Sequence, residues 1–349
     1  MGLFSNLFKN KSNNDNNNIH YVAEVKFEVE EVKNHYEPYI PSFQGDYAKT
    51  IFLWKHEKTH TVCDNDNYTR YFIYECGIKN PRQYHIDLIN DGYFQEATYK
   101  EVLNTFSAKN LKEILEHENQ PKTGKKELLI NRIIENIDED VIKSYITEPY
   151  YIISKKGYDF VQTHYDYVLL HKYKRFNIDW REYDKKKMPG YSFYDTVWGI
   201  LNERVMEDKR NFGRNQYMFM YEICRDQGKR DRALELILTV LYIDLSGSCE
   251  INAYNLYTNC DFRTKEDMFK YYDIACMCAP GTIKLIEEFY DIYDDKIVDE
   301  LYKWKLPVQI CSKEDFLLIV HSVFDFTCTE QKVKDILYPK YCNFIESLK

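Results

Sequence analysis

The beginning of the chain combines an alternating segment with a short apolar one. In the segment VAEVKFEVEEV, the apolar residues Val25, Phe27 and Val29 alternate with charged neighbours. This two-residue period predicts a half-buried strand. The apolar segment TIFLW at 50–54 is short enough to be a second strand that pairs with the first. We therefore expect a small α+β region here.

Helical patterns replace the strand patterns further along. Asn80 followed by Pro81 predicts a capped helix start, because proline is well suited to the first helical position. Thr98 and Glu101 have the spacing of a capping box, and three short helices are expected within 98–146.

Long helical patterns dominate after Tyr191. The expected helices span 193–207, 211–227, 230–243, 265–277, 281–292, 295–304, 313–324 and, in pieces, 330–348. Gly228 predicts the turn of a helical hairpin between the second and third of them. Ser312 and Asp315 have capping-box spacing at the start of a later helix. No 34-residue period accompanies the hairpin, so we expect an irregular multi-helix domain and not a repeat array.

These patterns predict a mainly α protein. Its expected parts are a flexible tail at 1–18, a small α+β region at 19–97, a helical module at 98–146, a basic aromatic connector at 147–190 and a helical domain at 191–349. The first part has a short amphipathic start, but two helical turns are marginal alone, which favours a frayed tail over a membrane or partner contact.

Composition narrows the classes of function. The 349 residues include only 12 Gly and 9 Pro, and they contain neither a G-x-G-x-x-G nor a G-x-x-x-x-G-K-[ST] motif. Loops that hold nucleotide phosphates are therefore not expected. The net charge of −9 argues against a uniformly basic nucleic-acid coat, so any such binding needs a local patch.

The sequence also indicates where in the cell the protein is expected to be. The longest uncharged apolar run, at 236–243, is eight residues, whereas a membrane-spanning helix needs about 20. The N-terminus has neither a secretory signal nor a complete myristoylation pattern. The 10 cysteines are irregularly spaced without a C-x-x-C pair, which favours reduced thiols in a cytoplasmic protein.

One stretch, at 105–137, has a specific pattern. Leu111, Ile114 and Leu115 form one apolar helical face, and Leu129 and Ile133 continue a second helix at four-residue spacing. The linker between them, HENQPKTGKK, contains residues suited to a sharp change of direction. Two helices packed around a small core are therefore expected.

The expected start of the second helix favours anion binding. Thr123 can cap this helix, which places Gly124, Lys125 and Lys126 in its first turn. Lysine is disfavoured at the positive end of a helix dipole unless an anion binds there. Glycine lets a sugar-phosphate backbone approach the main chain closely. The combination predicts a phosphate-binding site.

The same stretch resembles the SAP domain, a helix-extended-helix module of about 35 residues, over approximately 98–140. The matching positions are Leu111, Lys112, Leu115, Pro121, Gly124, Lys125, Lys126, Leu129, Ile130, Arg132 and Ile133. With its flanks, the chain looks like a SAP-domain-containing protein of low-GC Gram-positive bacteria or their phages. Two positions depart from the family pattern: Asn119 replaces the usual glycine and Gln120 the usual apolar residue.

The resemblance implies DNA binding, often to AT-rich duplex, by a module that tethers a larger protein. Phosphate contacts would come from Gly124, Lys125 and Lys126. Lys122 and Thr123 would support them from the turn, with Lys109 or Lys112 nearby from the first helix. Arg132 completes the implied set of DNA-binding residues. The implied protein is a non-enzymatic DNA tether without a cofactor, whose helices at 191–349 bind a protein partner.

Other interpretations stay open. The module has six Lys and one Arg against six Glu over 98–137, so it can equally be a structural unit of a helical protein-interaction scaffold. A second basic stretch, at 171–187, either binds single-stranded nucleic acid through its aromatic residues or is a surface loop with core anchors. Cys276 and Cys278 lack a second pair for zinc, and no catalytic motif is visible. A nucleic-acid enzyme with an unrecognised site is a third alternative.

Overall fold

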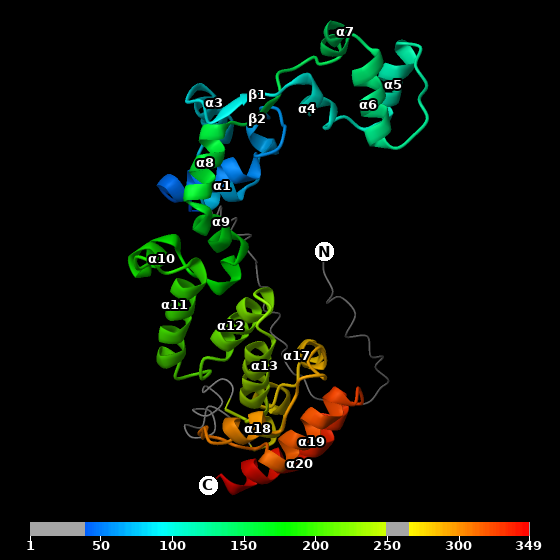
Figure 1. Cartoon of the computed structure of the whole chain (residues 1–349). Helices are drawn as coiled ribbons and strands as arrows, with labels where there is room; N and C mark the ends of the chain where they lie inside the picture. The colour runs from blue at the N-terminus through cyan, green and yellow to red at the C-terminus, as the bar shows by residue number, and fades with distance from the viewer. Residues whose placement is uncertain (1–38, 249–264, 349) are drawn as a thin grey trace, which may run out of the picture. The chain divides into compact units, whose positions relative to one another are not determined.

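The structure is a computed structural model that describes residues 39–248 and 265–348 (Figure 1). It confirms a mainly α fold with a small α+β part. Within the described residues, the only sheet has two antiparallel strands, β1 (Phe94–Glu96) and β2 (Tyr151–Ile153). The tail at 1–18 and the strand expected around Phe27 lie outside the described residues.

The segment at 50–54 is helical, so the prediction of a strand there was wrong. It lies within α1 (Gly45–Lys55), where Ala48, Ile51 and Phe52 are completely buried on one face. A short apolar run fits a strand or a buried helix equally well, and here the packing of its apolar face against the core favours the helix. The other elements around this helix are η1 (Asn65–Asn67), α2 (Tyr71–Tyr74), α3 (Pro81–Asn90), α8 (Lys155–Thr163) and α9 (Tyr165–Lys172).

Elements from both sides of the helical module share one core, here called the first core. Its buried residues are Ala48, Ile51, Phe52, Leu53, Tyr68, Phe72, Cys76, Ile78, Leu88, Phe94, Val161 and Val168. The last two come from the stretch at 147–190 that the sequence assigned to a connector. The later part of that stretch, including Phe176 and Tyr183, contributes to the core of the C-terminal helices. This stretch is therefore a part of two packed regions.

The module is an insertion between the two strands. Phe94 of β1 pairs with Ile153 of β2, and the Ala97 N–H donates to the Tyr150 carbonyl at 2.9 Å. The chain leaves β1, forms α4 (Tyr99–Leu103), α5 (Ala108–His117), α6 (Lys126–Asn136) and α7 (Glu139–Ser144), and returns through β2 (Figure 1). Four short helices are present where three were expected. Both ends of the module are thus fixed at one short sheet, the module base.

The module has a core of its own. Its buried residues are Leu103, Leu111, Ile114, Leu115, Leu129, Ile130, Ile133, Ile137 and Ile142. The predicted capping box at Thr98 is confirmed, since Glu101 accepts from the Thr98 N–H at 2.7 Å. This small, separate core carries the candidate site.

Gly157 at the module base packs too closely for a side chain. An added Cβ would lie 2.3 Å from the Tyr93 carbonyl oxygen, which is main chain and has little freedom to move. We expect Gly157→Ala to lower the free energy of unfolding by about 1–3 kcal/mol. Gly199→Ala is the matched control, because nothing lies within 4 Å there and alanine favours the helix by about 1 kcal/mol. Urea denaturation of both variants would test this, and equal stabilities would contradict it.

The remaining helices agree with the expected ranges to within three residues at 193–207, 211–227, 230–243 and 313–324. The expected helix 265–277 is divided in two, those at 281–292 and 295–304 are shorter, and the one at 330–348, expected in pieces, is continuous. The observed elements are η2 (Lys174–Phe176), α10 (Trp180–Lys186), α11 (Phe193–Glu207), α12 (Arg214–Asp226), α13 (Arg230–Leu245), α15 (Lys265–Phe269), α16 (Tyr272–Ala275), α17 (Pro280–Glu287), α18 (Lys296–Leu301), α19 (Lys313–Phe324) and α20 (Glu330–Ser347). The α12–α13 hairpin is confirmed, with Gly228 at φ +69° in its turn (Figure 1). The last helix is continuous although it contains Pro339, because Val333, Leu337, Tyr341 and Ile345 bury one face at four-residue spacing.

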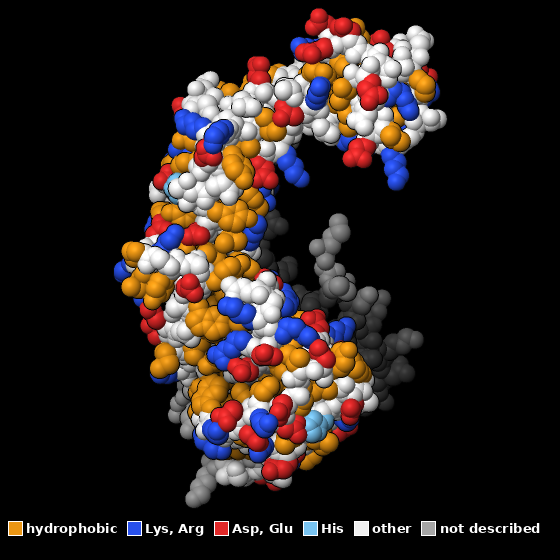
Figure 2. Space-filling view, in the orientation of Figure 1, with side chains coloured by type: hydrophobic (Ala, Val, Ile, Leu, Met, Phe, Trp, Pro, Cys, Tyr) orange, Lys and Arg blue, Asp and Glu red, His pale blue; other side chains and the backbone are white. Residues whose placement is uncertain are grey.

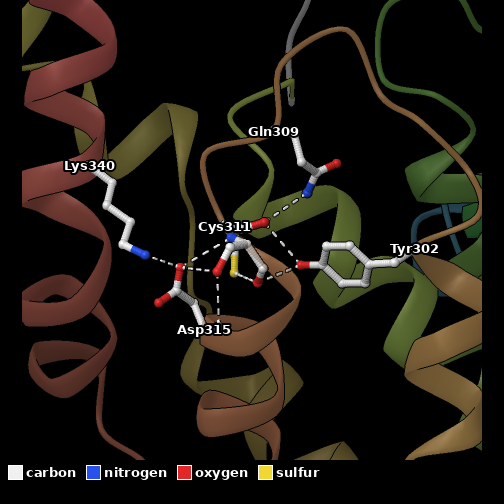
Figure 3. Close-up of polar contacts among 6 residues, drawn as sticks. Tyr302, Gln309, Cys311, Asp315 and Lys340 are labelled. Carbon is white, nitrogen blue, oxygen red and sulfur yellow. Dashed lines mark hydrogen bonds and ion pairs between the residues drawn. The ribbon is translucent and has the colours of Figure 1, made fainter.

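Polar contacts connect the last helices to one another. The predicted capping box of Ser312 and Asp315 is confirmed, and Lys340 of α20 pairs with the same carboxylate (Figure 3). The Tyr302 hydroxyl donates to the carbonyls of Cys311 and Ser312, both at 3.0 Å. This cluster fixes the start of α19 against its neighbours, which is a structural role.

Candidate nucleic-acid interface

The candidate interface is the linker between α5 and α6 together with the start of α6. The two helices pack through completely buried leucines, Leu111 and Leu115 from α5 and Leu129 from α6. Asn119 adopts the left-handed conformation at φ +54°, which asparagine tolerates well, so it can replace the glycine usual at this turn. The linker itself, from Pro121 to Lys125, is exposed.

The structure corrects the predicted helix start. Thr123 does not cap α6: the N-cap is Lys125, in an extended conformation, and the helix begins at Lys126. Gly124 has φ +129°, which a helix does not permit, so it belongs to the linker. Because no side chain caps α6, its first N–H groups have no side-chain acceptor. An anion is a suitable partner for such groups.

The lysines of the site differ in their partners. Lys112 and Lys125 are exposed, and the side chain of neither forms an ion pair or a hydrogen bond with the described residues. Lys126 is also exposed, and its Nζ donates to the Asn104 carbonyl at 2.7 Å. Lys122 pairs with Glu116, and Lys109 lies 3.8 Å from Glu113. Figure 2 shows both signs of charge mixed over the visible face of the module. The least engaged cation of the linker is therefore Lys125.

Arg132 stabilises the linker from α6. Its Nη1 donates to the carbonyls of Pro121 and Thr123, the second at 3.0 Å. Its guanidinium therefore faces the main chain of the linker, which argues for a positioning role and against the direct DNA contact that the sequence suggested. Charge-assisted hydrogen bonds of this kind are stronger than neutral ones.

Replacing Arg132 is expected to loosen the linker without unfolding the module. For Arg132→Lys we expect faster amide exchange at 121–126 and a loss of about 1 kcal/mol in stability, because a lysine does not reproduce the two-carbonyl geometry. Asn131→Ala, at an exposed neighbouring position of α6, is the control. Hydrogen exchange measured by mass spectrometry would report both, and unchanged exchange in Arg132→Lys would contradict the positioning role.

Sequence reasoning missed Leu128, an exposed apolar residue in the first turn of α6. Its side chain is 55% exposed, and its Cβ would lie 3.3 Å from a Cβ added at Gly124. The run Leu128–Leu129–Ile130 looks uniformly apolar in the sequence, but only the last two face the core. A helical projection of α6 that places Leu129 and Ile133 on the buried face would have shown Leu128 to lie beside that face and not on it.

The second basic stretch is largely neutralised by carboxylates. Its ion pairs are Lys174 with Glu75, Arg175 with Glu222, Arg181 with Asp179, Lys186 with Glu203 and Lys187 with Asp166. Its aromatic residues Tyr173, Phe176, Trp180 and Tyr183 pack in or against the C-terminal core. These contacts favour the interpretation as a surface loop with core anchors over a stacking surface for bases.

The buried cysteines are poor nucleophiles. Burial raises the pKa values of Cys278 and Cys311 to about 12, and it raises that of Cys276 even further. Thiols with raised pKa values are protonated and unreactive at neutral pH. Within 39–248 and 265–348, no group of three or more His, Cys, Asp or Glu residues is arranged to hold a metal ion.

Comparison with known proteins does not extend this description. No protein-family model, curated protein or solved structure matches the chain. In the part of the chain that the structure describes, no helix has the length and apolar character to cross a membrane. Function is therefore inferred from the geometry of the module.

Proposed function

We propose that the module at 98–140 is a SAP-like unit that binds duplex DNA, and that the chain is a non-enzymatic, cytoplasmic DNA tether. The observation that carries the proposal is the uncapped start of α6, where exposed Lys125 and Lys126 follow Gly124. Unpaired N–H groups, a helix dipole and two cations form a suitable environment for one phosphate. The free, mostly buried cysteines fit a reducing compartment.

The DNA contact would be small. Lys125 and Lys126 lie at the helix start, and Lys112 adds a cation from α5 that is not paired with an acid. Leu128 adds an apolar side chain suited to a deoxyribose ring. Because most of this contact is with the sugar-phosphate backbone of DNA, the module would position a larger protein on DNA with little discrimination between base sequences. The helices at 191–349 would then bind a protein partner.

A second function, a helical protein-interaction scaffold, is favoured by specific contacts. Lys122 is paired with Glu116, and Lys126 donates to the Asn104 carbonyl. In a scaffold, these lysines would stabilise the module itself and need no phosphate. The two functions differ in one measurable property, which is the dependence of DNA affinity on salt.

DNA binding should be strongly salt-dependent. If about three phosphates are neutralised, raising the salt from about 50 to 200 mM should weaken binding about 40-fold. Fluorescence anisotropy of the full chain with a labelled AT-rich duplex would measure this. Binding that is absent at about 50 μM protein, or that does not depend on salt, would contradict the tether and favour the scaffold.

A further inference from the structure

A cluster of three histidines lies beside the base of the module. The rings of His56, His60 and His85 have their centroids 4.8–5.1 Å apart. His85 is completely buried, and Tyr68 contacts it from the side opposite to His60. We call these four residues the histidine cluster.

The hydrogen bonds of the cluster determine which nitrogen atoms carry protons. The His60 Nδ1–H donates to the Lys58 carbonyl at 2.6 Å, which leaves its Nε2 as an acceptor. The His85 Nε2–H donates to that atom at 2.9 Å. The His85 Nδ1 accepts in turn from the Tyr68 hydroxyl at 2.8 Å. All of these bonds are satisfied when both rings are neutral.

Proton uptake disrupts this arrangement. A proton on the His60 Nε2 places two N–H donors 2.9 Å apart, one on His60 and one on His85. The charged His60 ring would then also repel any charge on the His85 ring beside it. His56 is the third member of the cluster, and its Nδ1–H already donates to the Phe52 carbonyl at 2.8 Å. Charging any of the three rings therefore costs a hydrogen bond of the cluster or buries an unpaired charge, which favours moving that ring into solvent.

The groups that surround the cluster offer little compensation. The titratable groups beside it are Cys63, whose N–H donates to the Tyr68 hydroxyl, and Arg82, which acts on Tyr68. The contacts from α2 and β1 are the aromatic rings of Phe72 and Phe94. The charges that act on His85 are those of His60 and His56 themselves. Burial without a carboxylate partner lowers the pKa of His56 to about 4 and that of His85 to about 3.

His60 and Phe94 connect the cluster to the module base. The main chain of His60 pairs with Tyr151 of β2 through two hydrogen bonds of 2.9 and 2.8 Å. The ring of Phe94, in β1, packs against both His60 and His85 at about 5 Å between centroids. Displacing the His60 ring therefore removes its packing against Phe94 of β1, at the residue whose main chain pairs with β2.

We propose that the histidine cluster is a proton-sensitive connection that holds the two ends of the inserted module. Neutral, it stabilises the pairing of β1 with β2. Protonated by solvent, it releases His60 and weakens that pairing. The consequence for DNA rests on the function proposed above: a released base leaves the module free to move relative to the remainder of the chain. The connection itself does not depend on DNA binding.

Hydrogen exchange in the full chain, without DNA, tests the connection. Peptides covering 58–63, 94–98 and 150–154 would be compared with peptides from α13 at pH 7.5, 6.0 and 5.0, after correction for intrinsic exchange rates. One histidine that is released on opening should increase opening of the base about 30-fold between pH 7.5 and 5.0. The α13 peptides should change far less.

Two variants separate the cluster from other effects of acid. In His60→Gln, the amide oxygen can accept from the His85 Nε2–H but takes up no proton, so the pH dependence at the base should be largely lost. If this variant does not fold, Tyr68→Phe serves instead: it frees the His85 Nδ1 and should move the release to higher pH. His321→Gln, on the exposed surface, is the control.

Two results would overturn the proposal. In the first, the peptides at the module base would exchange equally at all three pH values. In the second, the α13 peptides would lose exchange protection in parallel with those at the base, which would mean global unfolding. Because no DNA is present, either result would leave the DNA proposal untouched. Conversely, a protein that fails to bind DNA can still show the release.

Discussion

Leu115→Ala is expected to unfold the module while the first and C-terminal cores remain folded. Leu115 is completely buried in a core of only nine residues, and truncating a buried leucine costs about 2–5 kcal/mol. So small a core has little stability to spare. Exchange protection at 98–146 should therefore be lost, while protection in α13 should persist.

Leu128→Ala is the matched control, because it makes the same leucine-to-alanine change at an exposed position of the module. Leu128 is 55% exposed, so its truncation should change stability by less than about 0.5 kcal/mol. Equal exchange in the two variants would contradict the separate module core. Cooperative loss of protection throughout the chain in Leu115→Ala would also contradict it, because the module would then not be an independent unit.

Acidification is expected to destabilise the first core. The folded pKa values of His85 and His56, about 3 and about 4, lie below the ordinary value of 6.5, and burial also lowers the pKa of His60. The folded state then binds fewer protons than the unfolded one. The stabilising contribution is complete above pH 6.5 and is lost as the pH falls towards about 4.

The expected magnitude is large. Each histidine contributes up to about 1.4 kcal/mol per pH unit. Allowing for solvent screening at the two partly exposed rings, we expect a loss of about 4 kcal/mol between pH 7 and 5. Urea denaturation followed by the aromatic signals would measure it. His60→Gln should reduce the slope and His321→Gln should not. Equal unfolding midpoints at both pH values would show that the cluster is not buried as described.

The sequence predicted helices best where a cap and a long apolar stripe occur together. The limits of α11 and α19 agree with the expected 193–207 and 313–324, and each helix begins with a capping box. The short segment at 50–54 was misassigned, since five apolar residues contain too little periodicity to distinguish a strand from a helix. The pairing of β1 with β2 joins residues about 57 positions apart through strands of three residues. No local pattern indicates such a pairing.

The candidate site could be predicted in composition and only partly in geometry. The lysines and the glycine were identified from their spacing, and the exposed Lys125 and Lys126 lie at the start of α6. The predicted start of α6 was wrong by two residues. The positive φ of Gly124 keeps this residue in the linker, so the helix begins later than it would after a threonine cap. The role of Arg132 depends on where two carbonyl groups of the linker point, which is a property of the folded chain.

The measurement that tests the central claim most directly is DNA affinity after charge reversal at the start of α6. Anisotropy with an AT-rich duplex at about 50 mM salt would compare the wild type with Lys125→Glu/Lys126→Glu. The matched control, Lys209→Glu/Lys305→Glu, makes the same change in net charge at exposed positions outside the module. We expect the first variant to lose binding at least about 100-fold and the control to bind nearly as the wild type does. Equal affinities in the two variants would show that the start of α6 does not bind DNA.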